Sequence, residues 1–196
     1  LDSLPVRMLW KYPSRLTQVE LTDKRLNVIH KDARVVLRDA RHTYDAIYVA
    51  TGLPSDLASN RYFTEEFFTL ARTRLTSSGV LALCLPGSMS YISPELRDAN
   101  FLILNAVNRH FQRVRVMPGD YNIIVASAAA DLNLDASALY KRLSKRRVKL
   151  SLLNPAYLKA RLAGHWVTWF RKSGAGATTV VNRDDRPAAV YQSMIL

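Results

Sequence analysis

The amino-acid sequence predicts an α/β fold with a mostly parallel sheet that ends in an antiparallel hairpin. Short runs of consecutive apolar residues alternate with helical patterns, and residues 44–49 and 80–85 are the clearest runs. Strands that are apolar along their whole length are typical of a parallel sheet covered on both faces by helices. Residues 114–117 and 121–127 flank the turn Pro118-Gly119-Asp120, which is the pattern of a hairpin.

The first forty residues are predicted to hold two helices and two strands. Residues 4–12 have Pro5 near their start and Pro13 directly after them, as a short helix would. Strands are predicted at 17–21 and 26–29, with a helix at 33–38 behind the second. The connection between these strands is shorter than the roughly dozen residues of a parallel crossover. Either the strands are not parallel neighbours or residues are missing between Leu21 and Thr22, and we favour the second explanation.

The rest of the chain is predicted to be mainly helical outside the strands already described. Thr64 is a natural N-cap for a helix over 64–75, which has acids in its first turn and bases in its last. The remaining predictions are a helix from Ser93 to about Phe111, helices at 135–147 and 155–162, a strand at 165–170 and a polar turn at 182–187. We therefore predict an α/β domain over residues 1–130 and a basic helical extension over 131–196, packed on it.

The length and composition limit the classes of protein to which this chain can belong. The chain has 196 residues, 48% of them hydrophobic and 22% charged, which is typical of one soluble globular domain. It has no apolar run long enough to span a bilayer, and the single Cys84 excludes an intrachain disulfide. A cytoplasmic location is therefore expected. The chain begins at Leu1 rather than Met, which predicts that it is processed, trimmed or part of a longer polypeptide that could be membrane-tethered.

The net charge of +12 and the pI near 10.1 predict an anionic partner. The bases are densest in one predicted helix and its tail, at Lys141, Arg142, Lys145, Arg146, Arg147 and Lys149. A solvated helix face is the commonest explanation of such a run. The alternatives are an anionic membrane surface and, as the weaker alternative, nucleic acid.

Acids and polar residues follow the predicted strands, where a parallel α/β sheet binds its ligands. Glu20 ends the strand at 17–21 and could accept hydrogen bonds from both hydroxyls of a ribose, although it could also be a solvated acid. Asp32 follows the next strand and could accept from an adenine amino group, or it could cap the helix behind it. Thr51 and residues 86–88 follow two further strands and are expected on the same edge.

The sequence lacks the motifs of several common phosphate-binding, metal-binding and catalytic sites. It contains neither G-x-G-x-x-G nor a Walker A motif and has only 7 glycines, so no loop is a candidate for cradling phosphates. An S-adenosyl ligand carries no phosphate and fits this absence better. The four histidines are scattered and no nucleophile elbow occurs, so we predict neither a metal site nor a serine triad.

Several segments resemble the spermidine synthase (polyamine aminopropyltransferase) family, most closely its bacterial branch in which the synthase domain is fused to a membrane segment. Val19-Glu20-Leu21 is similar to that family's ribose-binding strand end, and Ile29-His30-Lys31-Asp32-Ala33-Arg34 to its adenine-side segment. The other similar segments are Tyr44-Asp45-Ala46-Ile47, Leu53-Pro54, residues 60–68, residues 75–81 and the polar tail at 182–187. The likeness covers most of residues 12–127 and that tail.

The resemblance implies a Rossmann-like, class I S-adenosylmethionine-dependent methyltransferase-like fold, in which residues 1–130 form the nucleoside-binding domain. It also implies transfer of an aminopropyl group from decarboxylated S-adenosylmethionine to an amine such as putrescine, with no permanently bound cofactor. Glu20 would hold the ribose, Asp32 and Ala33 the adenine, and Thr51 would belong to the same binding site. Where the family has an acid, commonly within D-S-x-D-P, this chain reads Ala50-Thr51-Gly52-Leu53-Pro54-Ser55-Asp56, which leaves Asp56 as the catalytic candidate. The family's glycine-rich loop and the helix after the ribose-binding acid have no counterpart.

We therefore expect a spermidine synthase-like protein whose catalytic competence is open. The alternatives are a catalytically degenerate module with an anionic partner and an S-adenosylmethionine-dependent methyltransferase. A small-molecule amine is the expected substrate, with a homodimer as an open alternative to a monomer. Because a +12 protein repels a dicationic amine, the site needs a local cluster of acids. The candidates are Glu20, Asp32, Asp56, Glu65 and Glu66.

Overall fold

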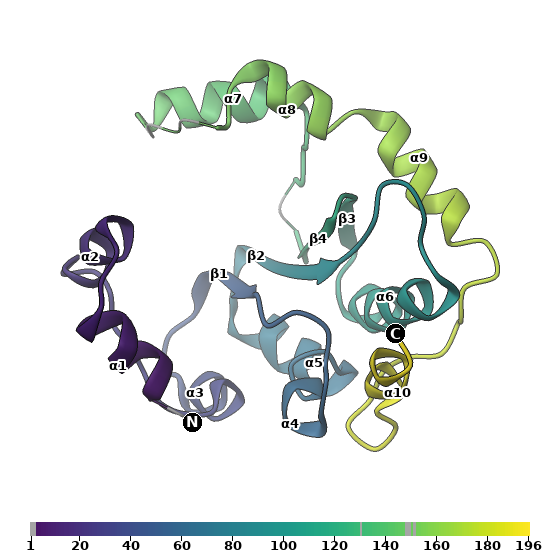
Figure 1. Ribbon diagram of the computed structural model, residues 1–196, viewed down its shortest axis with the longest axis horizontal. Coiled ribbons are helices and arrows are strands. Elements are labelled where there is room, and N and C mark those ends of the chain that lie inside the picture. Colours follow the sequence, from purple (N-terminus) through teal and green to yellow (C-terminus); the bar gives the residue numbers. More distant parts are fainter. Residues whose placement is uncertain (1–2, 130, 148–149, 151) are drawn as a thin grey trace. The chain divides into compact units, whose positions relative to one another are not determined.

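A computed structural model describes residues 3–129, 131–147, 150 and 152–196. The described residues belong to two compact units, one extending to Ala40 and the other comprising Arg41–Leu196 (Figure 1). The sheet lies in the second unit. The boundary at residues 130 and 131 that the sequence suggested stays a prediction.

The first unit contains three helices: α1 (Leu4–Lys11), α2 (Arg15–Leu21) and α3 (Ala33–Asp39). The strand predicted at 17–21 is wrong, because a capping box starts α2 there. The Ser14 hydroxyl accepts a hydrogen bond from the Thr17 backbone N–H at 3.1 Å, and the Thr17 hydroxyl accepts one from the Ser14 N–H at 2.7 Å. These bonds satisfy N–H groups that a helix start would leave unpaired.

The strand predicted at 26–29 is also wrong, since these residues have no regular secondary structure. A turn precedes them, in which Asp23 accepts from the backbone N–H of Arg25 at 2.9 Å. Val28 and Ile29 are 40% and 49% exposed. The described part of the first unit contains no strand with which this segment could pair, and an unpaired apolar run gains little from an extended conformation. The predicted helix α3 is confirmed.

The second unit has a four-stranded sheet in the order β1-β2-β4-β3. The strands are β1 (Tyr44–Val49), β2 (Leu75–Pro86), β3 (Arg113–Met117) and β4 (Tyr121–Ser127). Strand β1 is parallel to β2, whereas β4 is antiparallel to both β2 and β3. Strands β1, β2 and β3 therefore run in one direction and only β4 runs against them. This confirms the mostly parallel sheet with its C-terminal hairpin.

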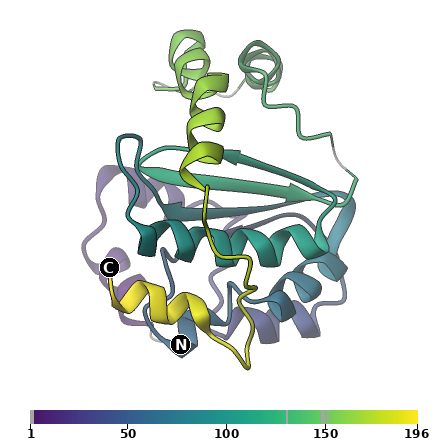
Figure 2. The same ribbon diagram turned by 90° about the vertical axis from the view of Figure 1, so that its right-hand side faces the viewer.

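One face of the sheet forms the core, because alternate residues of the strands are buried. Leu81, Leu83 and Leu85 of β2 are fully buried, as is Ile124 at 1% exposure on β4. Each such side chain contributes about 1.5–3 kcal/mol through the apolar surface that it removes from water. Helices α5 (Glu65–Arg74) and α6 (Pro94–His110) supply many of the other buried residues, and α6 lies along the sheet in Figure 2.

The caps of the core helices follow the sequence prediction. The Thr64 hydroxyl accepts from the backbone N–H of Phe67 at 3.4 Å, and the Ser93 hydroxyl accepts from the N–H of Leu96 at 3.2 Å. A further short helix, α4 (Leu57–Asn60), was not predicted.

The described residues after the sheet form helices α7 (Ala136–Lys145), α8 (Pro155–Arg161), α9 (Gly164–Ser173) and α10 (Ala188–Met194). The strand predicted at 165–170 is wrong, because these residues lie in helix α9. Trp166, Trp169 and Phe170 recur at helical spacing. Helical geometry places all three on one face. Phe170 is buried and its ring stacks on Phe101 of α6, with 5.4 Å between centroids. Among the described residues, no helix is long and apolar enough to cross a membrane.

Candidate functional site

The parallel pair β1–β2 defines the edge of the sheet where a ligand is expected. Val49 at the end of β1 lies opposite Leu83, and β2 continues to Pro86. The chain leaves β1 through the exposed Thr51 and through Gly52, whose φ of +76° is strained for other residues. We call this the carboxyl edge, and parallel α/β sheets bind their ligands at such edges.

The hairpin turn reaches the same carboxyl edge. Because β3 runs in the direction of β2, its last residue, Met117, lies at the edge where β2 ends. The backbone N–H of Gly87 donates to the carbonyl oxygen of Asp120 in the turn, at 2.8 Å. The residue after β2 is thus bonded directly to the hairpin turn.

Two buried amides hold this junction together. The Asn100 amide of α6 donates to the Pro86 carbonyl at 3.0 Å, and the Asn122 amide donates to the Asn100 side-chain oxygen at 3.1 Å. The Asn122 oxygen in turn accepts from the backbone N–H of Gly119 at 3.2 Å. Both side chains are about 1% exposed. Sequence reasoning missed them, although an asparagine inside an otherwise apolar helix or strand is a signal for such a network.

Arg161 of α8 fixes the basic helical segment to the turn. Its guanidinium donates to the carbonyl oxygens of Met117 at 3.4 Å and Tyr121 at 3.2 Å, and also to that of Pro118. A planar guanidinium can satisfy several carbonyl oxygens at once, which a lysine cannot do in the same geometry. Helix α8 is therefore tied through Arg161 to the hairpin turn at the carboxyl edge.

Asp56, the predicted catalytic acid, caps helix α4. Its carboxylate accepts from the Ser59 backbone N–H at 2.7 Å and from the Ser59 hydroxyl at 2.8 Å. The backbone bond from Ser59, and next its hydroxyl bond, lower the pKa of Asp56 below its ordinary value. The exposed carboxylate is therefore ionised at neutral pH and is a weak base.

This assignment predicts a titration that NMR can follow. The Ser59 amide proton should shift with a midpoint below about 3.9, the ordinary pKa of an aspartate. Because the folded pKa is lowered, the cap stabilises the fold above the unfolded pKa and is lost as the pH falls through the folded value. Asp56→Asn keeps a capping oxygen and should abolish the titration. A midpoint at or above the ordinary value would contradict the assignment.

The other predicted site residues are placed as follows. Glu20 lies inside α2 and is exposed, so it does not follow a strand. Asp32 is the N-cap of α3 and accepts from the Arg34 N–H at 2.8 Å, which confirms the capping alternative, and Ala33 is the first residue of that helix. These three residues belong to the first unit, whereas Thr51 and Asp56 belong to the second. Their roles toward ribose, adenine and amine stay predictions.

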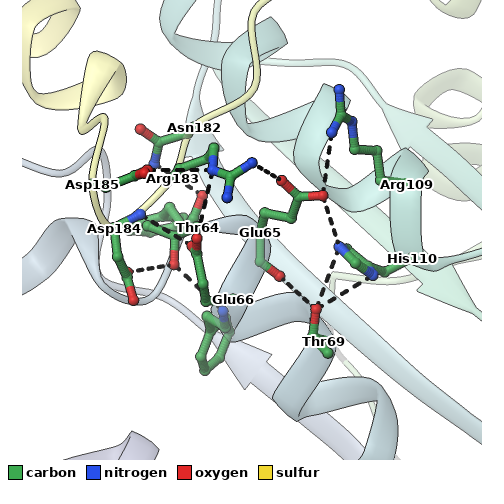
Figure 3. Close-up of polar contacts among 12 residues, drawn as sticks. Thr64, Glu65, Glu66, Thr69, Arg109, His110, Asn182, Arg183, Asp184 and Asp185 are labelled. Atoms are coloured by element: carbon green, nitrogen blue, oxygen red, sulfur yellow. Dashed lines mark hydrogen bonds and ion pairs between the residues drawn. The ribbon is translucent and has the colours of Figure 1, made fainter.

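Glu65, one of the acids considered for attracting a cationic substrate, is already surrounded by bases (Figure 3). Its carboxylate lies 3.3 Å from the Arg109 guanidinium, 3.5 Å from the His110 ring and 3.5 Å from Arg183. Its side chain is only 18% exposed. Glu65 is therefore neutralised within the fold.

Glu66 and Thr64 bind the C-terminal tail through an ion pair and hydrogen bonds (Figure 3). Glu66 lies 3.7 Å from the Arg183 guanidinium and accepts from the backbone N–H of Asp184 at 3.0 Å. The Thr64 hydroxyl donates to the Asp184 carboxylate at 2.8 Å. These contacts attach the polar tail to the start of α5, so neither acid of that helix contributes to an acidic substrate site.

Within the residues that the structure describes, no group of three His, Cys, Asp or Glu could hold a metal ion. The described groups at the carboxyl edge include the exposed Asp120 carboxylate of the turn, the Thr51 and Ser88 hydroxyls and the backbone groups of the loops, and Asp56 ends the loop that leaves β1. Such a set can hold a neutral or cationic ligand by hydrogen bonds and charge.

Known proteins similar to this chain include a polyamine aminopropyltransferase and spermidine synthases. No protein-family model matches it. The polyamine aminopropyltransferase of Corynebacterium efficiens is 32% identical over 119 residues, which cover 48% of this chain and 22% of that protein. This chain thus spans less than a quarter of that relative.

Three solved structures have the same fold. A spermidine synthase in complex with the transition-state analogue AdoDATO is 18% identical with a TM-score of 0.66, over 89% of this chain and 57% of that one. The Thermotoga maritima spermidine synthase is 19% identical with a TM-score of 0.66, over 89% and 58%. A probable spermidine synthase from Corynebacterium glutamicum is 18% identical with a TM-score of 0.53, over 86% and 59%. These likenesses confirm the resemblance to the spermidine synthases, and the chain has their Rossmann-like fold.

Proposed function

We propose that this chain belongs to a spermidine synthase-like protein that binds an S-adenosyl nucleoside at the carboxyl edge and transfers an aminopropyl group to an amine such as putrescine. The observation that carries the proposal is the 32% identity to a polyamine aminopropyltransferase over 119 residues. The geometry supports it because the Asn100–Asn122 network holds the end of β2 in a fixed position beside the loop that leaves β1.

The reaction makes one bond and breaks one. The lone pair of a neutral amine attacks the propyl carbon attached to the sulfonium of decarboxylated S-adenosylmethionine. The carbon–sulfur bond breaks, its electron pair stays on sulfur, and methylthioadenosine leaves. The new secondary ammonium then loses a proton. A positioned base that accepts this proton contributes about 10²–10⁴-fold to the rate.

Asp56 is better suited to attracting a cationic amine than to accepting its proton. Its carboxylate already accepts two hydrogen bonds from Ser59, and its pKa is lowered by them. An ionised carboxylate near the edge offsets part of the repulsion that a protein with a net charge of +12 exerts on a diamine. Thr51 could donate a hydrogen bond to the nucleoside from the loop that leaves β1.

The loop that leaves β1 also favours a second function, namely nucleoside binding without group transfer. The chain has Thr51 and Gly52 directly after β1, where the related synthases are expected to have an acid, and its nearest acid caps a helix. A protein with this arrangement could bind the nucleoside without transferring its aminopropyl group. Nucleoside binding and group transfer must therefore be tested separately.

Nucleoside binding is tested by thermal unfolding with methylthioadenosine or decarboxylated S-adenosylmethionine. A ligand at a hundredfold excess over its Kd adds about 2.7 kcal/mol of stability, which raises Tm by several degrees. Thr51→Val removes the hydroxyl proposed to hydrogen-bond the nucleoside, and it should reduce this shift. The matched control is Thr168→Val, on an exposed residue of α9. An unchanged Tm with both ligands would contradict the proposed function.

Group transfer is tested by the release of methylthioadenosine in the presence of putrescine. Asp56→Asn should lower the rate at least tenfold while the thermal shift with methylthioadenosine stays unchanged, because the cap is kept and only the charge is lost. A thermal shift without any release from the unaltered chain would support the binding module instead.

A further inference from the structure

The two helices α7 and α8 form a cationic surface, here called the basic hairpin (residues 136–161). Residues 136–182 contain ten lysines and arginines and no aspartate or glutamate. Helices α7 and α8 lie side by side (Figures 1 and 2), and α8 reaches the β3–β4 turn through Arg161 at its end. The positive charge of the basic hairpin is therefore unbalanced along the sequence.

Six of the described bases in the basic hairpin are exposed, and their side chains make no ion pair or hydrogen bond with another described residue. They are Lys141, Arg142, Lys145, Arg146, Arg147 and Lys159, whereas Lys149 of the predicted basic run lies outside the described residues. Among the described residues, none of these six side chains makes an ion pair or a hydrogen bond. Arg161, the remaining described base of the basic hairpin, and Arg183 of the tail are instead bound within the fold. Six unpaired bases on one short segment favour an external anion.

A groove of about 610 Å³ between the two helices adds hydroxyl groups to these charges. Its polar lining comprises Ser137, Tyr140, Ser144, Lys141 and Lys159, with Asp135 at one end. The Asp135 carboxylate is used as the N-cap of α7, where it accepts from the Ala138 N–H at 2.8 Å. Hydroxyl donors beside two ammonium groups suit a phosphate group, whose oxygens accept charge-assisted hydrogen bonds.

Exposed apolar residues distinguish between the possible sources of that phosphate. Leu150 and Leu152, in the segment that joins α7 to α8, are 44% and 77% exposed, and Tyr140 and Tyr157 are 39% and 47% exposed. A nucleic-acid backbone gives aliphatic side chains nothing to contact, whereas a bilayer buries them among acyl chains and places tyrosines at its interface. The combination of bases and exposed leucines favours a lipid surface.

We propose that the basic hairpin binds the surface of an anionic membrane. The bases contact phosphate headgroups, the groove between α7 and α8 accepts one headgroup, and Leu150 and Leu152 enter the acyl region. This contact is peripheral and does not depend on the proposed enzymatic function. Each base near an anionic surface increases binding about fivefold, and each buried leucine about tenfold.

The first test uses the full chain and cosedimentation with phosphatidylcholine vesicles, with and without phosphatidylserine. Binding should require phosphatidylserine, and Lys141→Gln/Lys145→Gln/Arg146→Gln should weaken it on the order of a hundredfold. The matched control, Lys24→Gln/Lys31→Gln/Arg113→Gln, removes the same charge from exposed bases elsewhere and should weaken it far less. Equal loss in both variants, or binding to neutral vesicles alone, would overturn the assignment to the hairpin.

The second test separates a membrane from nucleic acid. Leu150→Ser/Leu152→Ser leaves the charge unchanged and should weaken vesicle binding by at least tenfold. Both side chains are exposed, so circular dichroism should show an unchanged fold. A random DNA duplex is then offered to the unaltered chain together with the anionic vesicles at one ionic strength. Preference for the duplex, or vesicle binding that is insensitive to the two leucines, would contradict the proposal.

Discussion

Replacing Asn182 by Ala should destabilise the protein by about 3–5 kcal/mol, because this fully buried amide joins the C-terminal tail to the core. Its amide group donates to the Asn60 side-chain oxygen at 2.9 Å and to the Phe63 carbonyl at 3.0 Å. Its oxygen accepts from the backbone N–H of Ala189 at 3.1 Å. Alanine would leave all three partners unpaired in the interior, which costs more than the bonds contributed.

Urea unfolding measures this effect, as a lower midpoint with an unchanged slope. Asn108→Ala is the matched control, since Asn108 is exposed on the core helix α6, and it should change the stability by no more than about 0.5 kcal/mol. A loss of less than 1 kcal/mol in Asn182→Ala would show that the tail is not held through this amide. A loss of about 3–5 kcal/mol would be large, because the free energy of unfolding of such a domain is only about 5–15 kcal/mol in total.

The contacts around Asn182 also explain the polar tail. The Asn182 carbonyl accepts from the backbone N–H of Glu65 at 3.0 Å, at the start of α5. The bonds from Thr64 to Asp184 and from Asp184 to Glu66 lie next to it. Polar residues near the chain end thus satisfy the unpaired N–H groups and complement the dipole of a core helix. The sequence showed the polar turn and the cap of α5 but not that they meet.

Those parts of the fold that local patterns determine could be predicted from the sequence. The apolar runs at residues 46–49 and 80–85 lie in strands β1 and β2, and helices α5 and α6 follow Thr64 and Ser93, which are good caps. The turn at Pro118-Gly119-Asp120 similarly identified the hairpin. In each of these cases local chemistry and tertiary packing favour the same conformation.

The errors occurred where local patterns are ambiguous. Residues 17–21 and 165–170 contain β-branched and aromatic residues, yet both are helices. In α2 the capping box at Ser14 decides the conformation, and in α9 the packing of Phe170 on Phe101 decides it. β-propensity reflects packing against neighbouring strands more than a backbone preference, so a segment without such neighbours does not express it.

The candidate site was predictable only in part. The position of Thr51 and residues 86–88 at the carboxyl edge follows from strand order, which the sequence indicated. That Asp56 is a helix cap, and that Glu65 and Glu66 are paired with Arg183, depends on contacts between distant segments. Long-range pairing of this kind leaves no trace in spacing or periodicity.

Gly87 occupies the tightest position at the carboxyl edge. A Cβ at this residue would lie 2.6 Å from the Asn122 amide nitrogen and 2.7 Å from its Cγ, and it would also overlap the Gly119 carbonyl oxygen. Asn122 cannot move away without breaking its bonds to Asn100 and Gly119, and the turn is held by the Gly87 N–H itself. The glycine is therefore required by close approach of the backbone, whatever its φ.

Gly87→Ala should accordingly destabilise the protein by about 2–4 kcal/mol, through overpacking and loss of the buried amide network. Gly164→Ala is the matched control, because a Cβ there has nothing within 4 Å and alanine suits the first turn of α9 better than glycine. The free energy of unfolding of the Gly164→Ala variant should stay the same or rise by up to about 1 kcal/mol. The Asn122 side-chain amide signals should shift in Gly87→Ala and stay in place in Gly164→Ala. If Gly87→Ala unfolds at the same urea concentration as the unaltered chain, the network does not hold the carboxyl edge.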